Sequence, residues 1–155
     1  MNIKIRDANI SDANLIYEWT NDPLTRKNSF NSKQIEWEDH IKWLEMKIKD
    51  EKYFIYIFEA ENKPIGMVRF ESNEYAVIGV TIAPDFRGKG FGSEIIKLGC
   101  ERFSLTNKQK ILAYIKTANS SSIKVFQKAG FSFIRDNEYN SIPCKILILR
   151  RNANS

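Results

Sequence analysis

The sequence predicts an α/β sandwich in which about four helices flank a mixed, mostly antiparallel sheet. Short apolar runs typical of strands alternate along the chain with longer stretches in which apolar residues recur every three or four positions, as in helices. No internal repeat, linker or low-complexity stretch interrupts them, and 155 residues suit one domain. We therefore expect a single domain over residues 1–151 and a frayed polar tail at 152–155.

The first half of the chain is expected to hold a strand, two helices and a hairpin. The strand covers 3–7, a loop at 21–31 joins helices at 12–20 and 33–49, and the hairpin strands cover 53–59 and 65–72. Gly66, inside the hairpin, predicts a bulge or a close approach of another segment. The second half is expected to hold, in order, a strand at 75–83, a helix at 93–103, a strand at 110–115, a helix after Asn119, and strands near 131–136 and 144–149.

The most informative segment is the turn Arg87-Gly88-Lys89-Gly90-Phe91-Gly92, between the apolar run 75–83 and the helix predicted at 93–103. Three glycines without Cβ atoms let a ligand approach the backbone N–H groups closely. The start of the following helix adds N–H donors and a partial positive charge, and Arg87 and Lys89 add two formal charges. This combination predicts a phosphate or pyrophosphate site.

Other glycine-rich turns fit this segment poorly. A Walker loop ends in Gly-Lys-Ser/Thr, whereas Gly90-Phe91-Gly92-Ser93 stands here. The dinucleotide fingerprint needs a third glycine and a later acidic strand, and both are missing. A turn without any ligand is the remaining alternative. The two cations and the helix directly after the turn favour the anion site.

Two motifs resemble a known family. Arg87-x-x-Gly90-x-Gly92 resembles the acetyl-CoA loop of the GCN5-related N-acetyltransferases (GNAT family), with the pattern Arg/Gln-x-x-Gly-x-Gly/Ala, and Asn119-x-x-Ser122 followed by Phe126-x-Lys128-x-Gly130-Phe131 resembles the family's second segment. The resemblance covers residues 75–135 and implies the GNAT fold and acetyl-CoA as co-substrate. It also implies cofactor contacts from Ile82, Ala83, Arg87, Gly88, Lys89, Gly90, Phe91, Gly92, Ser93, Asn119, Ser122, Phe126 and Lys128. In this family the residue at Asn119 binds the pantetheine arm, and Phe126 lies near the thioester sulfur.

The second segment also has a physical interpretation of its own. Asn119 is a good N-cap, Ile123 and Phe126 lie three apart on one helix face, and Gly130 stands where a left-handed C-cap is needed. These features describe a plain amphipathic helix, and its contact with the pantetheine arm is what the family resemblance adds.

The acceptor is expected to meet the region of the first two helices and their connecting loop. Trp19-Thr20-Asn21-Asp22-Pro23 through Arg26, Asn28, Ser29 and Phe30 resembles a subgroup that acetylates the 4-amino group of nucleotide-linked dideoxy sugars, as in pseudaminic acid synthesis. Trp-x-Asn-Asp also occurs in N-terminal acetyltransferases of ribosomal proteins, so a peptide acceptor is the alternative. The resemblance implies acceptor contacts from Trp19, Asn21, Arg26, Asn28 and Ser29.

Hydrophobic spacing limits what the second helix contributes. Trp37, Ile41, Leu44 and Ile48 follow a helical period and are expected in the core. His40 lies at the edge of this stripe, so a buried, hydrogen-bonded histidine and a substrate contact both remain open.

The expected reaction is direct attack of a neutral amine on the thioester, with an N–H near Ile82 stabilising the oxyanion. Relatives often carry a tyrosine acid where this chain has Phe126, and a glutamate base at the position aligned with Val77. Glu74 or His40, acting through water, are the candidates for the missing catalytic groups. An amine with a pKa of about 8 needs less help than lysine at about 10.4, so we expect a low-pKa acceptor. A non-catalytic acyl-CoA-binding module is the further alternative.

Composition restricts partners and location. The net charge of +5 arises from scattered cations with acids between them, which does not favour nucleic acid. No apolar run is long enough for a membrane span, and the first residues do not resemble a signal peptide. Cys100 and Cys144 predict buried thiols in the cytoplasm, and the single histidine disfavours a metal site. We further expect a small-molecule amine as the acceptor, a monomer or homodimer, and no membrane or nucleic-acid partner.

Overall fold

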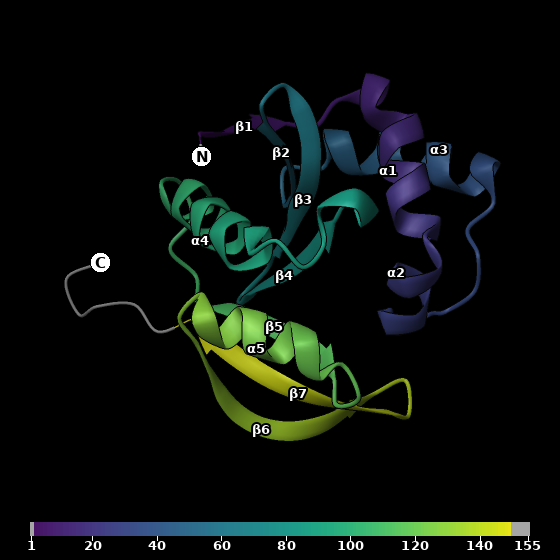
Figure 1. Cartoon of the computed structure of the whole chain (residues 1–155). Helices are drawn as coiled ribbons and strands as arrows, with labels where there is room; N and C mark the ends of the chain where they lie inside the picture. The colour runs from purple at the N-terminus through teal and green to yellow at the C-terminus, as the bar shows by residue number, and fades with distance from the viewer. Residues whose placement is uncertain (1, 150–155) are drawn as a thin grey trace.

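One sheet of seven strands organises the protein, in a computed structural model that describes residues 2–149. The expected tail at 152–155 lies outside the described residues. The spatial order is β1-β2-β3-β4-β5-β7-β6 (Figure 1), and every adjacent pair is antiparallel except β4 and β5. The strands are β1 (Ile3–Asp7), β2 (Tyr53–Ala60), β3 (Lys63–Ser72), β4 (Ala76–Ile82), β5 (Ile111–Lys116), β6 (Phe131–Tyr139) and β7 (Ile142–Leu149). The predicted mixed, mostly antiparallel α/β sandwich is therefore confirmed.

Five α-helices of the described residues cover the two faces of this sheet (Figure 1). They are α1 (Ala13–Asn21), α2 (Pro23–Asn28), α3 (Trp37–Lys49), α4 (Phe91–Ser104) and α5 (Ser120–Lys128), with short 3-10 turns η1 (Ile10–Asp12) and η2 (Pro84–Phe86). On one face, α4 and α5 bury a core that includes Phe58, Phe70 and Phe103. On the other, α1 and α3 pack over Ile57 and Met67.

Two helix boundaries differ from the sequence prediction. The segment predicted as a loop contains α2, because Asp22 caps it by accepting from the Thr25 N–H and Pro23 occupies its first turn. The helix predicted from residue 33 begins at Trp37, because Glu36 has an extended backbone with ψ 145°. The predicted core stripe of α3 is buried only at its middle: Leu44 is fully buried, whereas Trp37 and Ile48 are 39% and 40% exposed.

The hairpin of β2 and β3 confirms the close approach predicted at Gly66. A Cβ there would lie 2.7 Å from the Thr81 carbonyl oxygen of β4 and 3.0 Å from Ile95 Cδ1 of α4. The register also shifts here: Phe58 pairs with Gly66 and Glu59 with Pro64, so Ile65 is the extra residue and the bulge lies in β3, next to Gly66. Gly66 therefore lets α4 pack directly against the third and fourth strands.

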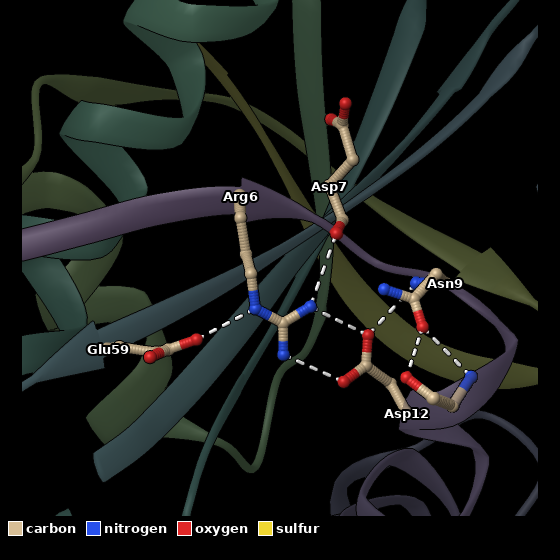
Figure 2. Close-up of polar contacts among 6 residues, drawn as sticks. Arg6, Asp7, Asn9, Asp12 and Glu59 are labelled. Carbon is tan, nitrogen blue, oxygen red and sulfur yellow. Dashed lines mark hydrogen bonds and ion pairs between the residues drawn. The ribbon is translucent and has the colours of Figure 1, made fainter. Parts of the chain in front are cut away.

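Arg6 fastens the first strand to the first helix (Figure 2). Its guanidinium donates to both carboxylate oxygens of Asp12 at 2.7 and 2.8 Å and to Glu59 of β2 at 2.7 Å. Asp12 also accepts from the Asn9 N–H at 2.9 Å, completing a capping box with Asn9. The hydrogen bond from Arg6 holds the pKa of Asp12 below its ordinary value, against the opposing effect of burial. This network positions α1 and thereby the segment that follows it.

Candidate functional site

The site begins where β4 and β5 separate. These strands are parallel and pair at only two positions, Ala76 with Ile111 and Val77 with Leu112, although both continue for several residues. The Ala76 N–H donates across to the Lys110 carbonyl, whereas the Ala83 N–H donates to Ile65 on the opposite side. Because N–H directions alternate along a strand, the N–H groups of Val80 and Ile82 point toward the side where β5 has diverged. This edge of β4 offers donors to a ligand.

The glycine turn follows directly at the open end of β4. Gly88 and Gly90 have φ of 73° and 84°, in the left-handed region that favours glycine, and Gly90 caps α4. A Cβ at either position would meet no atom within 4 Å, so the space beside this backbone is open. The first turn of α4 (Phe91, Gly92 and Ser93) adds unpaired N–H donors. The turn therefore leaves its backbone open to a ligand, and its role as a pyrophosphate cradle stays a prediction.

The two cations of this turn have different partners. Arg87 donates to the Asp22 carboxylate of the α2 cap, with Nη2 to Oδ2 at 2.6 Å, and to the Thr25 hydroxyl at 3.3 Å. Burial acts to raise the pKa of Asp22, but the hydrogen bond from Arg87 and the N–H of Thr25 bring it below the ordinary value. Lys89 lies 5.4 Å from the centre of the Phe86 ring and makes no ion pair with the described residues. Lys89 is thus the cation of the turn that remains uncompensated.

The helix α5 lies beside the turn, as the second motif predicts. Asn119 caps it, with Oδ1 accepting from the Ser122 N–H at 3.2 Å. A Cβ at Gly92 would lie 2.8 Å from Val125 Cγ1, so the start of α4 packs against the middle of α5. Lys128 is exposed and lies three residues beyond Val125, on the same side of the helix.

Ile82 ends β4, and the buried Ala83 begins the path to the turn. Phe126, at 3% exposed, packs edge-on against Phe131 at 5.1 Å between ring centres and has no proton to donate. The structure therefore brings both predicted motifs to the open edge of β4.

The predicted acceptor loop is held together by Arg26. Its guanidinium donates to the carbonyl oxygens of Thr20, Asn31 and Lys33 and to the Ser29 hydroxyl, at 2.7 to 3.1 Å. Burial lowers the pKa of Arg26, and the positive charge of Arg69 lowers it further. All of its nitrogens are engaged within the loop, so its predicted contact with substrate phosphate stays a prediction.

The other predicted acceptor residues also have structural tasks. Asn21 bridges to both the N–H and the carbonyl of Ile35, at 2.8 and 2.9 Å, and the Ser29 hydroxyl donates to the Thr25 carbonyl at 2.6 Å. Trp19 belongs to the core and is 4% exposed. Asn28, half-buried at the end of α2, makes no side-chain hydrogen bond to the described residues.

The face of the sheet toward α1 and α2 carries residues that the sequence analysis missed. Ala76 and Ile78 belong to the core under α4, so alternation turns Gly79 and Thr81 to the opposite face, together with Tyr114 of β5. Arg69 of β3 is paired with Gly79 on that face. The signal was present in the sequence, since Arg69 interrupts an apolar strand at a position where alternation predicts a covered side chain.

The β6–β7 hairpin reaches the same region from the other half of the sheet. Tyr139 contacts Phe30 of the acceptor loop, with ring centres 5.0 Å apart, and lies 6.3 Å from the ring of Tyr114. Lys116, at the end of β5, donates to the Lys27 carbonyl at 2.8 Å. Aromatic rings and cations thus lie beside the predicted acceptor loop, on the side where β4 and β5 separate.

Neither predicted catalytic group lies at the open edge of β4. Glu74 is exposed in the turn before β4, at the paired end of the strand, while Ile82 lies at the other end. His40 is 2% exposed between α1 and α3, where Nε2 lies 2.8 Å from the Ala13 carbonyl oxygen. Of the two alternatives left open for His40, the structure gives the buried, hydrogen-bonded one.

Three further findings concern the described residues. No cluster of metal-ligating side chains occurs among residues 2–149. Both cysteines are buried as thiols. The described part of the chain has no helix of the length and hydropathy that crossing a bilayer requires.

Comparison with known proteins agrees with this geometry. A family model described as an acetyltransferase (GNAT) domain matches residues 2–132. The uncharacterized N-acetyltransferase YfmK of Bacillus subtilis is 34% identical over 88 residues, which cover 56% of this chain and 59% of that protein. The chain spans between 20% and 59% of the length of the curated relatives that it matches.

Solved structures show the same fold at low identity. The spermidine N-acetyltransferase of Vibrio cholerae, in complex with CoA and spermine, has a TM-score of 0.84 at 19% identity, covering 94% of both chains. The aminoglycoside acetyltransferase AAC(6')-Ib, in complex with coenzyme A, has a TM-score of 0.83 at 18% identity, covering 97% of this chain and 95% of that one.

Proposed function

This chain belongs to the GNAT acetyltransferase family, and we propose that it moves the acetyl group of acetyl-CoA to a primary amine by direct attack. The observation that carries the proposal is the cradle at the start of α4. Two left-handed glycines beside open space continue a strand whose outer N–H groups at Val80 and Ile82 have no neighbouring strand. Such a cradle suits a pyrophosphate, and such a strand edge suits an extended arm with amide groups.

In the proposed step, the amine nitrogen attacks the thioester carbon, the new C–N bond forms, and the C–S bond breaks with the electron pair leaving on sulfur. The proton lost by nitrogen passes to solvent or to the thiolate. The N–H groups of Val80 and Ile82 point to the side where the carbonyl oxygen gains charge, so they are the proposed oxyanion donors. The remaining contribution of the protein is to orient the two reactants.

The acceptor is proposed to be a low-pKa amine. Glu74 and His40 both lie away from the open edge, and Phe126 cannot donate a proton, so no assigned group manages a strongly basic amine. An amine with a pKa of about 8 is partly neutral at pH 7, whereas one near 10.4 is almost wholly protonated. An amino-sugar nitrogen or a peptide N-terminus belongs to the first class.

Within that class we propose the 4-amino group of a nucleotide-linked dideoxy sugar, in the cytoplasm. The rings of Phe30, Tyr114 and Tyr139 offer stacking surfaces. The guanidinium groups of Arg26 and Arg69, neither of which pairs with a carboxylate of residues 2–149, lie on the same side of the sheet. Two solved relatives are named for spermidine and aminoglycosides, which are polycationic amines, whereas four curated relatives are named for mycothiol. A cationic acceptor side favours a different substrate here.

The test is thiol release from acetyl-CoA with a panel of UDP-4-amino-4,6-dideoxy sugars, N-terminal peptides and polyamines, each confirmed by product mass. Release with the sugar nucleotide supports the proposal. Release with peptides alone assigns the protein to N-terminal acetylation. If acetyl-CoA binds but no amine causes thiol release, the second candidate is favoured, a non-catalytic acyl-CoA-binding module. This candidate is supported by Phe126 and Val77, which stand where relatives often carry Tyr and Glu.

A further inference from the structure

Arg69 occupies an unusual position in the middle of the sheet. It is half-buried on β3, on the face toward α1 and α2, and its side chain lies across Gly79 of β4. A Cβ at Gly79 would lie 2.8 Å from Arg69 Nε and 3.5 Å from Cζ. Gly79 has no positive φ, so its backbone does not require glycine. The missing side chain at this position therefore makes room for the guanidinium.

The charge of Arg69 is not balanced by the protein around it. Its guanidinium makes no hydrogen bond or ion pair with any residue of 2–149, although Glu71 lies two positions away on the same face. Arg26, which the positive charge of Arg69 reaches, is paired with carbonyl and hydroxyl oxygens and not with a carboxylate. The carboxylate at the start of α2, Asp22, is engaged by Arg87. A partly desolvated cation of this kind gains most from an anionic partner.

The location links this charge to the reacting amine. Gly79 directly precedes Val80, whose N–H points to the open edge. At about 3.3 Å per residue, Gly79 lies about 10 Å along the strand from Ile82. Tyr114 of β5 projects on the same face, beyond the two paired positions of β4 and β5. An acceptor that approaches the thioester from this face passes the guanidinium of Arg69.

We propose that Arg69, with the charge of Arg26 behind it, forms an anion subsite that binds a phosphate group carried by the acceptor amine. The subsite selects phosphate-bearing amines and repels polyamines, because a cation on the acceptor's approach disfavours a substrate with several positive charges. Gly79 is the residue that creates the subsite. This inference rests on the proposed acetyl transfer and narrows its acceptor.

The kinetic test compares an amino sugar with and without its nucleotide diphosphate, in the wild-type protein and in Arg69→Met, Arg69→Lys and Arg69→Glu. Arg69→Met should raise KM for the phosphorylated acceptor about tenfold or more, as expected for losing a charge-assisted hydrogen bond. KM for the unphosphorylated sugar and for acetyl-CoA should change less than about twofold by the same reasoning. Arg69→Lys should retain part of the preference, and Arg69→Glu should improve turnover of spermidine. Equal KM changes for both sugars would overturn the subsite.

A second measurement separates this inference from the proposed function. UDP, which has no amine, is titrated by calorimetry into protein saturated with CoA, so that the cofactor cradle is already filled. The wild-type protein and the control variant Lys63→Met, an exposed cation of the same strand, should bind UDP equally, and Arg69→Met should bind it about tenfold more weakly. UDP binding that does not depend on Arg69 rejects the subsite even when amines are acetylated. If UDP binding depends on Arg69 but no amine is acetylated, the subsite is supported and the proposed function is rejected.

Discussion

Arg87 of the glycine turn donates to Asp22, the N-cap of α2, over 2.6 Å between Nη2 and Oδ2, although the two residues are 65 positions apart. The same Asp22 carboxylate accepts from the Thr25 N–H at 3.3 Å. One carboxylate thus caps the helix of the acceptor loop and fastens that loop to the proposed cofactor cradle. The arrangement joins the two halves of the candidate site.

Replacing either partner of this ion pair should affect both substrates. Asp22→Ala removes a helix cap and leaves Arg87 half-buried without its carboxylate, so the free energy of unfolding should fall by about 1–2 kcal/mol. KM should rise for both acetyl-CoA and the amine. Urea unfolding and steady-state kinetics of Asp22→Ala, Arg87→Ala and the double variant measure this. Strict additivity of the two single effects would show that the residues are not coupled.

The left-handed backbone at Gly90 makes a second prediction. Gly90→Ala places a Cβ at φ 84°, which should cost about 1 kcal/mol of stability and raise the KM of acetyl-CoA. Asn62→Ala is the matched control, because Asn62 also has positive φ, at 64°, but lies in the turn between β2 and β3. Both variants should lose stability in urea, and Gly90→Ala alone should weaken the binding of acetyl-CoA. A normal KM for Gly90→Ala would remove the turn from the cofactor site.

Arg26 should be a stability residue as well as a feature of the acceptor loop. Arg26→Ala removes donors to three carbonyls and one hydroxyl, so we expect a loss of about 2 kcal/mol and faster proteolysis between residues 20 and 36. KM for the acceptor should rise because the loop loses its shape. Unchanged stability with a raised acceptor KM would instead identify Arg26 as a direct substrate contact.

Acid should destabilise the protein through Asp12 and Asp22. Both have a native pKa below the unfolded value of about 3.9. Their ionised forms therefore stabilise the fold fully above that value, and the stabilisation is lost as pH falls through the native pKa. The free energy of unfolding, measured in urea between about pH 6 and pH 2.5, should decline most steeply below about pH 4. Asp12→Asn should make the decline shallower, and an unchanged slope would contradict the role of the Arg6 network.

Local chemistry made much of the fold and the cofactor side predictable. Gly88 and Gly90 take left-handed conformations at a helix start, Asn119 caps α5, and Gly130 has φ 102° after it. Each outcome depends on a few neighbouring residues. The start of α2 was also readable from Asp22 and Pro23, but turn chemistry and helix capping use the same residue types.

The acceptor side depends on contacts between distant segments. Arg87 was predicted as a free cation of the cradle, and its partner became visible only when α2 and the glycine turn were placed together. Arg26 was assigned to the substrate because a loop cation looks available when its carbonyl partners are unknown. No role was predicted for Arg69, because the space for its side chain depends on Gly79 in the adjacent strand.

The central claim is acetyl transfer to a phosphate-bearing amine of low pKa. Its most direct measurement is kcat/KM for acetyl transfer to a UDP-4-amino-4,6-dideoxy sugar and to spermidine, in one protein preparation at about pH 7, with products identified by mass. We predict that kcat/KM for the sugar nucleotide exceeds that for spermidine by a factor of about 200 or more, since amine pKa values of about 8 and about 10.4 alone give neutral fractions at pH 7 that differ by about that factor, and charge repulsion adds to the difference. Faster acetylation of spermidine would contradict the account.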